Sequence, residues 1–308
     1  MADFYPRLLE THGPAGTGLE EPYASFEDAP GSSVPVTGLP VSGPHYPLEF
    51  ARRLFAQESL HPFFSSAHTG GEGEVEPYSL QWFLNIENQR HSKHGRWIPR
   101  LLEFAKHSGE TLLGLGHGLG TDWVQYARHG ADVIICTPSM PQLQLIRRNF
   151  ELRGLLGRFI HARPVSLPLE TASIDVACIS SLDAAAGDLR PLVYEVYRVL
   201  KPGGKVLAVT RSRRDVDYWS TMLLYWYRAF LPTRTHATPR RLSGAELCQL
   251  FDGFIDHRVH KRQLRRSEVP HVWRWLPLPL LARLMGRFLI LKALKPLSAA
   301  LPWQTQAA

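Results

Sequence analysis

Short β-branched or apolar runs alternate with longer segments of helical spacing through the middle of the chain. Ala131–Cys136 is one such run, and Pro141–Leu152, which follows it, has the spacing of a helix. This alternation is typical of βαβ units and predicts a parallel sheet covered by helices. The other expected strands are residues 112–115, Phe159–Ala162, Ser173–Ser180 and Lys205–Thr210, and the other expected helices are Trp123–Arg128 and Leu189–Leu200.

Further elements precede this alternating region. Residues 80–91 have apolar positions at helical spacing, and Ser79 is a suitable N-cap for that helix. Ile98–His107 predicts a second helix, and Leu48–Leu60 a short one. Residues 1–47 contain recurrent Pro and Gly without apolar periodicity, which predicts a disordered tail.

The last third adds two closing strands, Phe254–His260 and Arg287–Leu294, and a helix from Ser243 to Phe251. Trp219–Leu231 is an aromatic-rich helix, either a lid over a substrate or a helix buried on the domain. Val272–Met285 mixes Trp, Leu and Arg; Pro277 and Pro279 interrupt it, which favours a packed surface segment over a helix lying on a membrane. We therefore divide the chain into a tail (1–47), a helical cap (48–108), an α/β domain (109–296) and a C-terminal tail (297–308).

Charge is distributed unevenly over the 308 residues, whose formal net charge is +7. Up to Arg90 there are 4 Lys/Arg and 12 Asp/Glu, whereas from Lys201 onward there are 19 and 6. A solvated surface is the favoured interpretation of the basic third, and peripheral membrane contact stays open. Its clusters Arg211–Arg214 and Lys261–Arg266 lack interleaved aromatic residues, so nucleic acid is a weaker hypothesis.

The cysteines and the apolar runs of the sequence indicate the cellular compartment of the protein. Cys136, Cys178 and Cys248 lie far apart within apolar runs, which predicts buried thiols and neither a disulfide framework nor a metal site. The N-terminus has no basic region followed by an apolar core, and no run of eighteen apolar residues occurs. We therefore expect a cytoplasmic protein without a spanning helix.

The strongest local signal is the glycine-rich segment Thr111–Asp122, which reads TLLGLGHGLGTD. A buried strand leads into glycines at 116, 118 and 120, and Thr121 or Asp122 is expected to cap the helix that follows. Such a strand-to-helix turn cradles an adenosine-containing or anionic ligand at the open edge of a doubly wound sheet. A dinucleotide-binding G-x-G-x-x-G turn would need glycine at 121, where Thr121 stands.

Three strings, in the right order, resemble class I S-adenosylmethionine-dependent methyltransferases of the type 11 group. They are GHGLGTD at 116–122, SLPLETASIDV at 166–176, and YEVYRVLKPGG at 194–204, and residues 289–296 are similar to the family's last strand. The resemblance covers about Glu76 to Pro296. It implies a Rossmann-like, doubly wound seven-stranded α/β sheet of order 3-2-1-4-5-7-6 with strand seven antiparallel, and S-adenosylmethionine as the cofactor.

The sequence departs from the family at three acidic positions. The acid of the first strand is replaced by Gly114, the ribose-binding acid after the second strand by Thr137, and the adenine-binding acid after the third strand by Arg163. A hydrogen bond to a charged group contributes roughly 1.5–3 kcal/mol. Loss of the ribose and adenine acids would therefore weaken cofactor binding by about a hundredfold to ten-thousandfold.

The resemblance assigns candidate residues to both halves of a site. Cofactor contacts are expected from the turn and the strand ends, namely Gly114, Gly116, His117, Gly118, Gly120, Asp122, Thr137, Pro138, Arg163, Pro164 and Ser180. Substrate-side candidates are Tyr78, Arg90, His91 and Ser181.

Two hypotheses about function follow. The first is an S-adenosylmethionine-dependent methyltransferase that acts on a small-molecule acceptor by direct methyl transfer. The second is an inactive methyltransferase fold that serves as a binding or scaffold subunit, with an anionic ligand near Arg163.

Overall fold

The computed structural model describes residues 75–91, 95–180, 182, 188–220, 222, 241–264, 266, 269, 273 and 275–297. All of them belong to one unit of the structure, Ser33–Ala308. The predicted tail 1–47, the helix Leu48–Leu60, Ser181 and most of Trp219–Leu231 lie outside the described residues.

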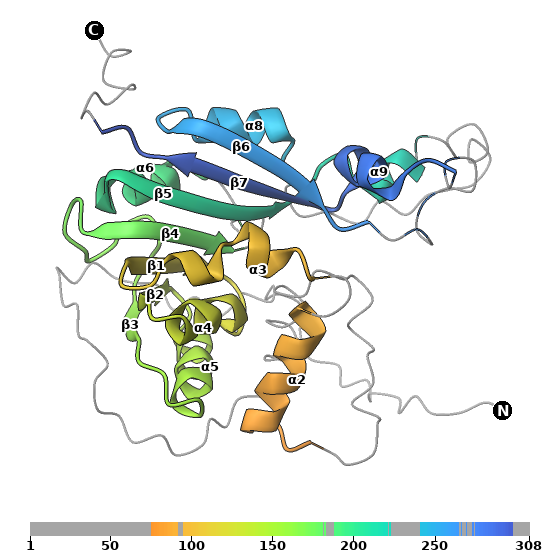
Figure 1. Cartoon of the computed structure of the whole chain (residues 1–308). Coiled ribbons are helices and arrows are strands. Elements are labelled where there is room, and N and C mark those ends of the chain that lie inside the picture. Colours follow the sequence, from red (N-terminus) through yellow and green to blue (C-terminus); the bar gives the residue numbers. More distant parts are fainter. Residues whose placement is uncertain are drawn as a thin grey trace, which may run out of the picture. The chain divides into compact units, whose positions relative to one another are not determined.

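Seven strands form a single sheet of order β3-β2-β1-β4-β5-β7-β6 (Figure 1). The pairs from β3 to β5 are parallel, and β7 is antiparallel to both β5 and β6. The predicted fold class and strand order are therefore confirmed. The strands are β1 (Thr111–Gly116), β2 (Asp132–Thr137), β3 (Arg158–His161), β4 (Ile174–Ser180), β5 (Leu200–Arg211), β6 (Ile255–Arg262) and β7 (Phe288–Leu294).

Most helices begin and end close to the predicted positions, but Leu278–Met285 is helical although Pro277 and Pro279 were expected to interrupt a helix there. Ser79 accepts a hydrogen bond from the amide of Trp82, and Ser243 forms a capping box with Glu246. No described helix has both the length and the apolar character needed to cross a membrane. The helices are α2 (Leu80–His91), α3 (Ile98–Leu101), the 3₁₀ turn η2 (Phe104–Lys106), α4 (Thr121–Arg128), α5 (Met140–Glu151), α6 (Arg190–Val199), α8 (Gly244–Leu250) and α9 (Leu278–Met285).

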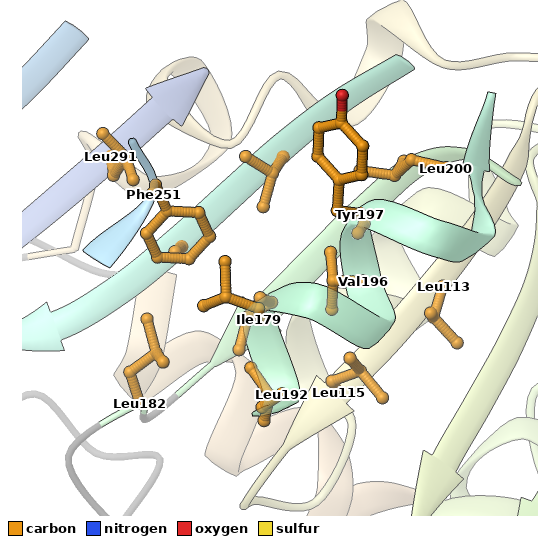
Figure 2. Close-up of a cluster of buried hydrophobic side chains, with 14 of the residues drawn as sticks. Leu113, Leu115, Ile179, Leu182, Leu192, Val196, Tyr197, Leu200, Phe251 and Leu291 are labelled. Atoms are coloured by element: carbon orange, nitrogen blue, oxygen red, sulfur yellow. The ribbon is translucent and has the colours of Figure 1, made fainter. Parts of the chain in front are cut away.

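Strand periodicity divides the buried side chains between two cores. Leu113, Leu115 and Ile179 point to the face covered by α6 and α8, where they meet residues such as Val196 and Phe251 (Figure 2). The intervening strand residues point to the other face, covered by α3, α4 and α5. Because both faces of the inner strands are covered, β1, β2 and β4 are buried along most of their length.

The thiols behave as buried apolar groups. Cys136 and Cys178 are buried, and Cys248 is partly buried. Burial raises the pKa of the Cys136 and Cys178 thiols to about 12, so both remain protonated at neutral pH.

Four local predictions were wrong. Ile98–His107 is not one helix, because Glu103 has a left-handed backbone (φ 58°) between α3 and η2. The strand expected to begin at Lys205 begins at Leu200, and helical residues begin at 216 instead of 219. Neither Thr121 nor Asp122 caps α4, since Gly120 occupies the N-cap without a side-chain hydrogen bond.

Glu103 ties this break to the sheet. Its carboxylate lies 2.8 Å from the ammonium groups of both Lys205 on β5 and Lys292 on β7. Burial alone would raise the pKa of Glu103, but its hydrogen bonds and charge interactions with the two lysines lower the pKa to about 2. The left-handed turn thus places one carboxylate where it can pair with two strands.

Replacement of Glu103 by Gln should destabilise the protein by about 1–3 kcal/mol at neutral pH. Because the folded-state pKa is depressed, the stabilisation is present above the unfolded value of about 4.5 and is lost as pH falls toward about 2. Urea unfolding of wild type and Glu103→Gln across this range should give curves that converge in acid. Glu151→Gln, which breaks an exposed pair with Arg147, is the control and should change stability little. Equal losses in both variants would contradict the assignment.

Candidate active site

The carboxyl ends of four neighbouring strands bring most of the predicted cofactor residues together. Gly116 at the end of β1 pairs with Ser180 at the end of β4, and Thr137 at the end of β2 pairs with His161 at the end of β3. In open α/β sheets, ligands bind at this edge, where the strand order reverses. Here that reversal lies between β1 and β4.

Gly116 sets the shape of the turn. Its φ is 119°, and a Cβ at this position would lie 1.8 Å from the backbone oxygen of Ser180. Only glycine therefore permits β1 to approach β4 this closely. The Ser180 hydroxyl lies 3.2 Å from the carbonyl of His117 and 3.4 Å from that of Leu115. This side chain therefore attaches the turn to the end of β4.

Two buried polar residues of α5 hold the turn from the other side. Gln142 donates both amide hydrogens, to the carbonyls of Gly116 and Gly118 at 3.1 Å each. Asn149 donates to the carbonyl of Leu119 at 3.0 Å. Neither residue was predicted from the sequence. A signal for them is present, because they are polar positions seven residues apart on the face of α5 that otherwise carries apolar residues.

Thr137 is part of the same network. Its hydroxyl is fully buried, donates to the side-chain carbonyl of Gln142 at 3.0 Å and accepts from the amide of Ser139 at 3.3 Å. The hydroxyl hydrogen is therefore already used within the protein. At the position where the resemblance places a ribose-binding acid, the side chain thus makes an internal hydrogen bond.

Gly114 is explained by its neighbour on α4. A Cβ at this position would lie 2.8 Å from the indole ring of Trp123, which is 2 % exposed and packs flat over β1. The ring takes the space that an acidic side chain would need at residue 114. The missing first acid is thus coupled to a large aromatic residue on the adjoining helix.

Asp122 turns toward the N-terminal helix. Its carboxylate accepts hydrogen bonds from Nε (2.7 Å) and Nη2 of Arg90, and the ring of His91 lies 3.2 Å away. Burial alone would raise the pKa of Asp122, but the charge and hydrogen bonds of Arg90, with a smaller contribution from His91, hold it well below its ordinary value. Three predicted residues are thus brought together as a tie between α2 and α4.

The remaining candidates surround the turn. Tyr78 packs with Trp82 against a small cluster that contains Leu119 of the turn, and burial raises its pKa. His117 and Pro164 are half-buried, and Arg163 is exposed on the loop after β3. The carbonyl of Pro138 lies 2.8 Å from the ring of His161, which the sequence analysis did not identify. In the segments that directly follow β1, β2 and β3 (116–122, 137–140 and 161–164), Asp122 is the one residue that carries a carboxylate.

Comparison with known proteins agrees with this geometry. Residues 112–208 match the family model described as a methyltransferase domain. This part of the chain, from β1 to β5, carries the turn and all four strand ends. Over these residues the chain is therefore similar to a methyltransferase domain, and S-adenosylmethionine is the cofactor that this similarity implies.

The chain is 30% identical over 117 residues to a demethylmenaquinone methyltransferase of Thermus thermophilus, a match that covers 37% of this chain and 53% of the relative. It is 26% identical over 114 residues to a ubiquinone/menaquinone biosynthesis C-methyltransferase of Enterobacter sp., covering 35% and 45%. The chain thus spans about half the length of the curated relatives it matches.

Solved structures are similar at a lower level. The [4+2]-cyclase SpnF has a TM-score of 0.49 at 21% identity, covering 66% of this chain and 81% of that one. A geranyl diphosphate methyltransferase has a TM-score of 0.47 at 16% identity, covering 75% and 93%. Likeness of this degree carries no argument about function.

Gln142→Leu should destabilise the protein by about 2–4 kcal/mol, because two turn carbonyls and the Thr137 hydroxyl lose a buried partner. Gln249→Leu makes the same exchange at an exposed position of α8 and should change stability by less than about 0.5 kcal/mol. Urea unfolding of both variants checks the difference. If Gln142→Leu were as stable as wild type, the turn would not depend on this residue.

Proposed function

We propose that this protein transfers a methyl group from S-adenosylmethionine to a small, apolar acceptor in a single direct step. The observation that supports the proposal best is the set of side-chain hydrogen bonds that hold the glycine turn. Its carbonyls are held by side chains from α5 and β4, so the backbone of 116–120 has one shape before any ligand arrives. Side-chain hydrogen bonds that fix the backbone in this way are expected where the main chain forms the binding surface.

The residues that we assign to the cofactor act mainly through their backbone. Residues 116–120 would receive the amino-acid and sulfonium portion, and the segments after β2 and β3, with Pro138, Arg163 and Pro164, would flank the adenine. The uncapped start of α4 directs amides and the positive end of its dipole to the same place. When bound, the cofactor supplies an electrophilic methyl group, and the chain's part is to align the acceptor with it.

The cofactor's ribose is the weak point of the fit. Thr137 donates its only hydroxyl hydrogen to Gln142, and Trp123 occupies the space beside Gly114. The two ribose hydroxyls therefore receive no carboxylate from these positions. We expect binding through the main chain, with lower affinity than an acid-bearing site would give.

The acceptor side is less constrained. The matching family model covers residues 112–208, whereas the elements that would contact an acceptor, such as α2, lie outside it. The Thermus thermophilus relative is by its name a demethylmenaquinone methyltransferase, and Tyr78 and Trp82 place aromatic rings beside Leu119 of the turn. We infer an apolar, aromatic acceptor on this side.

A second candidate function is favoured by one observation. All three acidic positions of the family are occupied by other residues, and Thr137 is engaged internally. An inactive methyltransferase fold that acts as a binding or scaffold subunit would show the same departures. Cofactor binding separates the two functions.

Calorimetric titration with S-adenosylmethionine and S-adenosylhomocysteine should give a Kd of about 10 µM to 1 mM, because main-chain contacts remain and the acid contacts are missing. Gly118→Val should abolish binding, since residue 118 lies in the turn with φ 135°. Gly244→Ala, where a Cβ meets only ordinary contact, is the control and should bind like wild type. Circular dichroism verifies that each variant is folded. No binding by wild type at millimolar ligand would reject the enzyme and favour the scaffold.

The ribose can be tested separately. S-adenosylhomocysteine and its 2′-deoxy analogue should bind with affinities that differ by less than about threefold, because no charged acceptor from residue 137 reads the hydroxyls. A carboxylate at this position would produce a difference of about tenfold or more. A large preference for the ribo form would show that another carboxylate reaches the ribose.

A further inference from the structure

Helix α9 is apolar on two sides. Leu281 and Met285 are buried in a cluster with Val216 and Leu264 and attach the helix to the domain. Leu280 and Leu284, one turn apart, are 55% and 46% exposed, and Trp275 just before the helix is 77% exposed. The packing of α9 therefore accounts for one side only, and a row of large apolar side chains lies in water on the other.

Positively charged side chains lie on and near the exposed side of α9. Arg283 is exposed on the same side of α9 as Leu280 and Leu284. Lys261 lies at the end of the helix, where its ammonium donates to the carbonyl of Leu284 at 2.6 Å and to the carbonyl of Arg214. Within the described part of the chain, neither Arg214 nor Arg283 pairs with a carboxylate. Between Lys261 and Arg287 the sequence has seven Lys or Arg residues and one Glu.

We propose that the surface formed by Trp275, Leu280, Arg283 and Leu284, here called the α9 face, docks on an anionic lipid surface. Leucines enter the acyl boundary, tryptophan lies at the level of the headgroups, and arginine binds lipid phosphate. The excess of positive charge argues against a second copy of the chain as the occupant, because two such surfaces would repel each other.

The position of the α9 face gives the docking a consequence. β7 begins directly after α9, and its first residue, Phe288, pairs with Arg211 at the carboxyl end of β5 (Figure 1). The face therefore lies at the edge of the sheet that also carries the glycine turn. The docking proposal depends only on the exposed residues of the α9 face. The consequence that docking brings the acceptor side close to lipid-dissolved molecules rests on the proposed function.

Flotation of the full chain with vesicles tests the docking. The protein should float with vesicles of mixed phosphatidylcholine and phosphatidylglycerol, float about tenfold less with phosphatidylcholine alone, and be released by high salt. Leu280→Gln/Leu284→Gln should weaken binding to the anionic vesicles by about tenfold or more, and Arg283→Gln by about fivefold. Leu156→Gln, at a 90% exposed leucine between α5 and β3, is the matched control and should leave binding unchanged.

Three results would overturn the proposal. They are absence of flotation with anionic vesicles, equal flotation with both compositions, and unchanged binding of Leu280→Gln/Leu284→Gln. Light scattering of the same variants identifies the alternative occupant: a dimer that dissociates in the double variant, without lipid binding by wild type, would make the α9 face an interface between copies. Because vesicle binding and cofactor titration are separate measurements, failure of one leaves the other intact.

Discussion

The close approach of β1 and β4 at Gly116 is the constraint on which the site depends. With 1.8 Å between a hypothetical Cβ and the Ser180 oxygen, no other residue can occupy this position without moving a strand. The turn that starts there exposes carbonyls toward α5 and β4, and buried carbonyls require donors. Gln142, Asn149 and Ser180 supply them. The shape of this turn is therefore a property of β1, β4 and α5 together.

The same hydrogen-bond network restricts which side chain can occupy the end of β2. In this chain the end of β2 has Thr137, whose hydroxyl completes the bonding of Gln142. A carboxylate there would have no hydrogen to donate to the side-chain carbonyl of Gln142, and on β1 an acid at 114 would meet the ring of Trp123. At positions 137 and 114, an internal hydrogen bond and the packing of an aromatic ring thus take the place that acidic side chains would need.

Ion pairs attach the N-terminal elements to this core. Arg90 and Asp122 are both almost fully buried, so each needs the other to avoid an unpaired charge in the interior. Glu103 does the same on the sheet face through Lys205 and Lys292. These pairs bring α2 and the aromatic residues at its start, Tyr78 and Trp82, next to the glycine turn.

Local patterns were sufficient for much of the fold. The short apolar runs of β1, β2 and β4, the glycine turn and the string YEVYRVLKPGG predicted the strands, the nucleotide edge and, through the family resemblance, the strand order. The break at Glu103, the hydrogen bond between Thr137 and Gln142, the ring of Trp123 over Gly114 and the partner of Asp122 could not be predicted in this way. Periodicity is a property of neighbouring residues, so the sequence by itself determined which faces are apolar and where the chain turns. Each of the other features depends on which distant side chain fills a space or pairs with a charge, and only the tertiary structure decides that, because it alone brings residues 32 positions apart, such as Arg90 and Asp122, into contact.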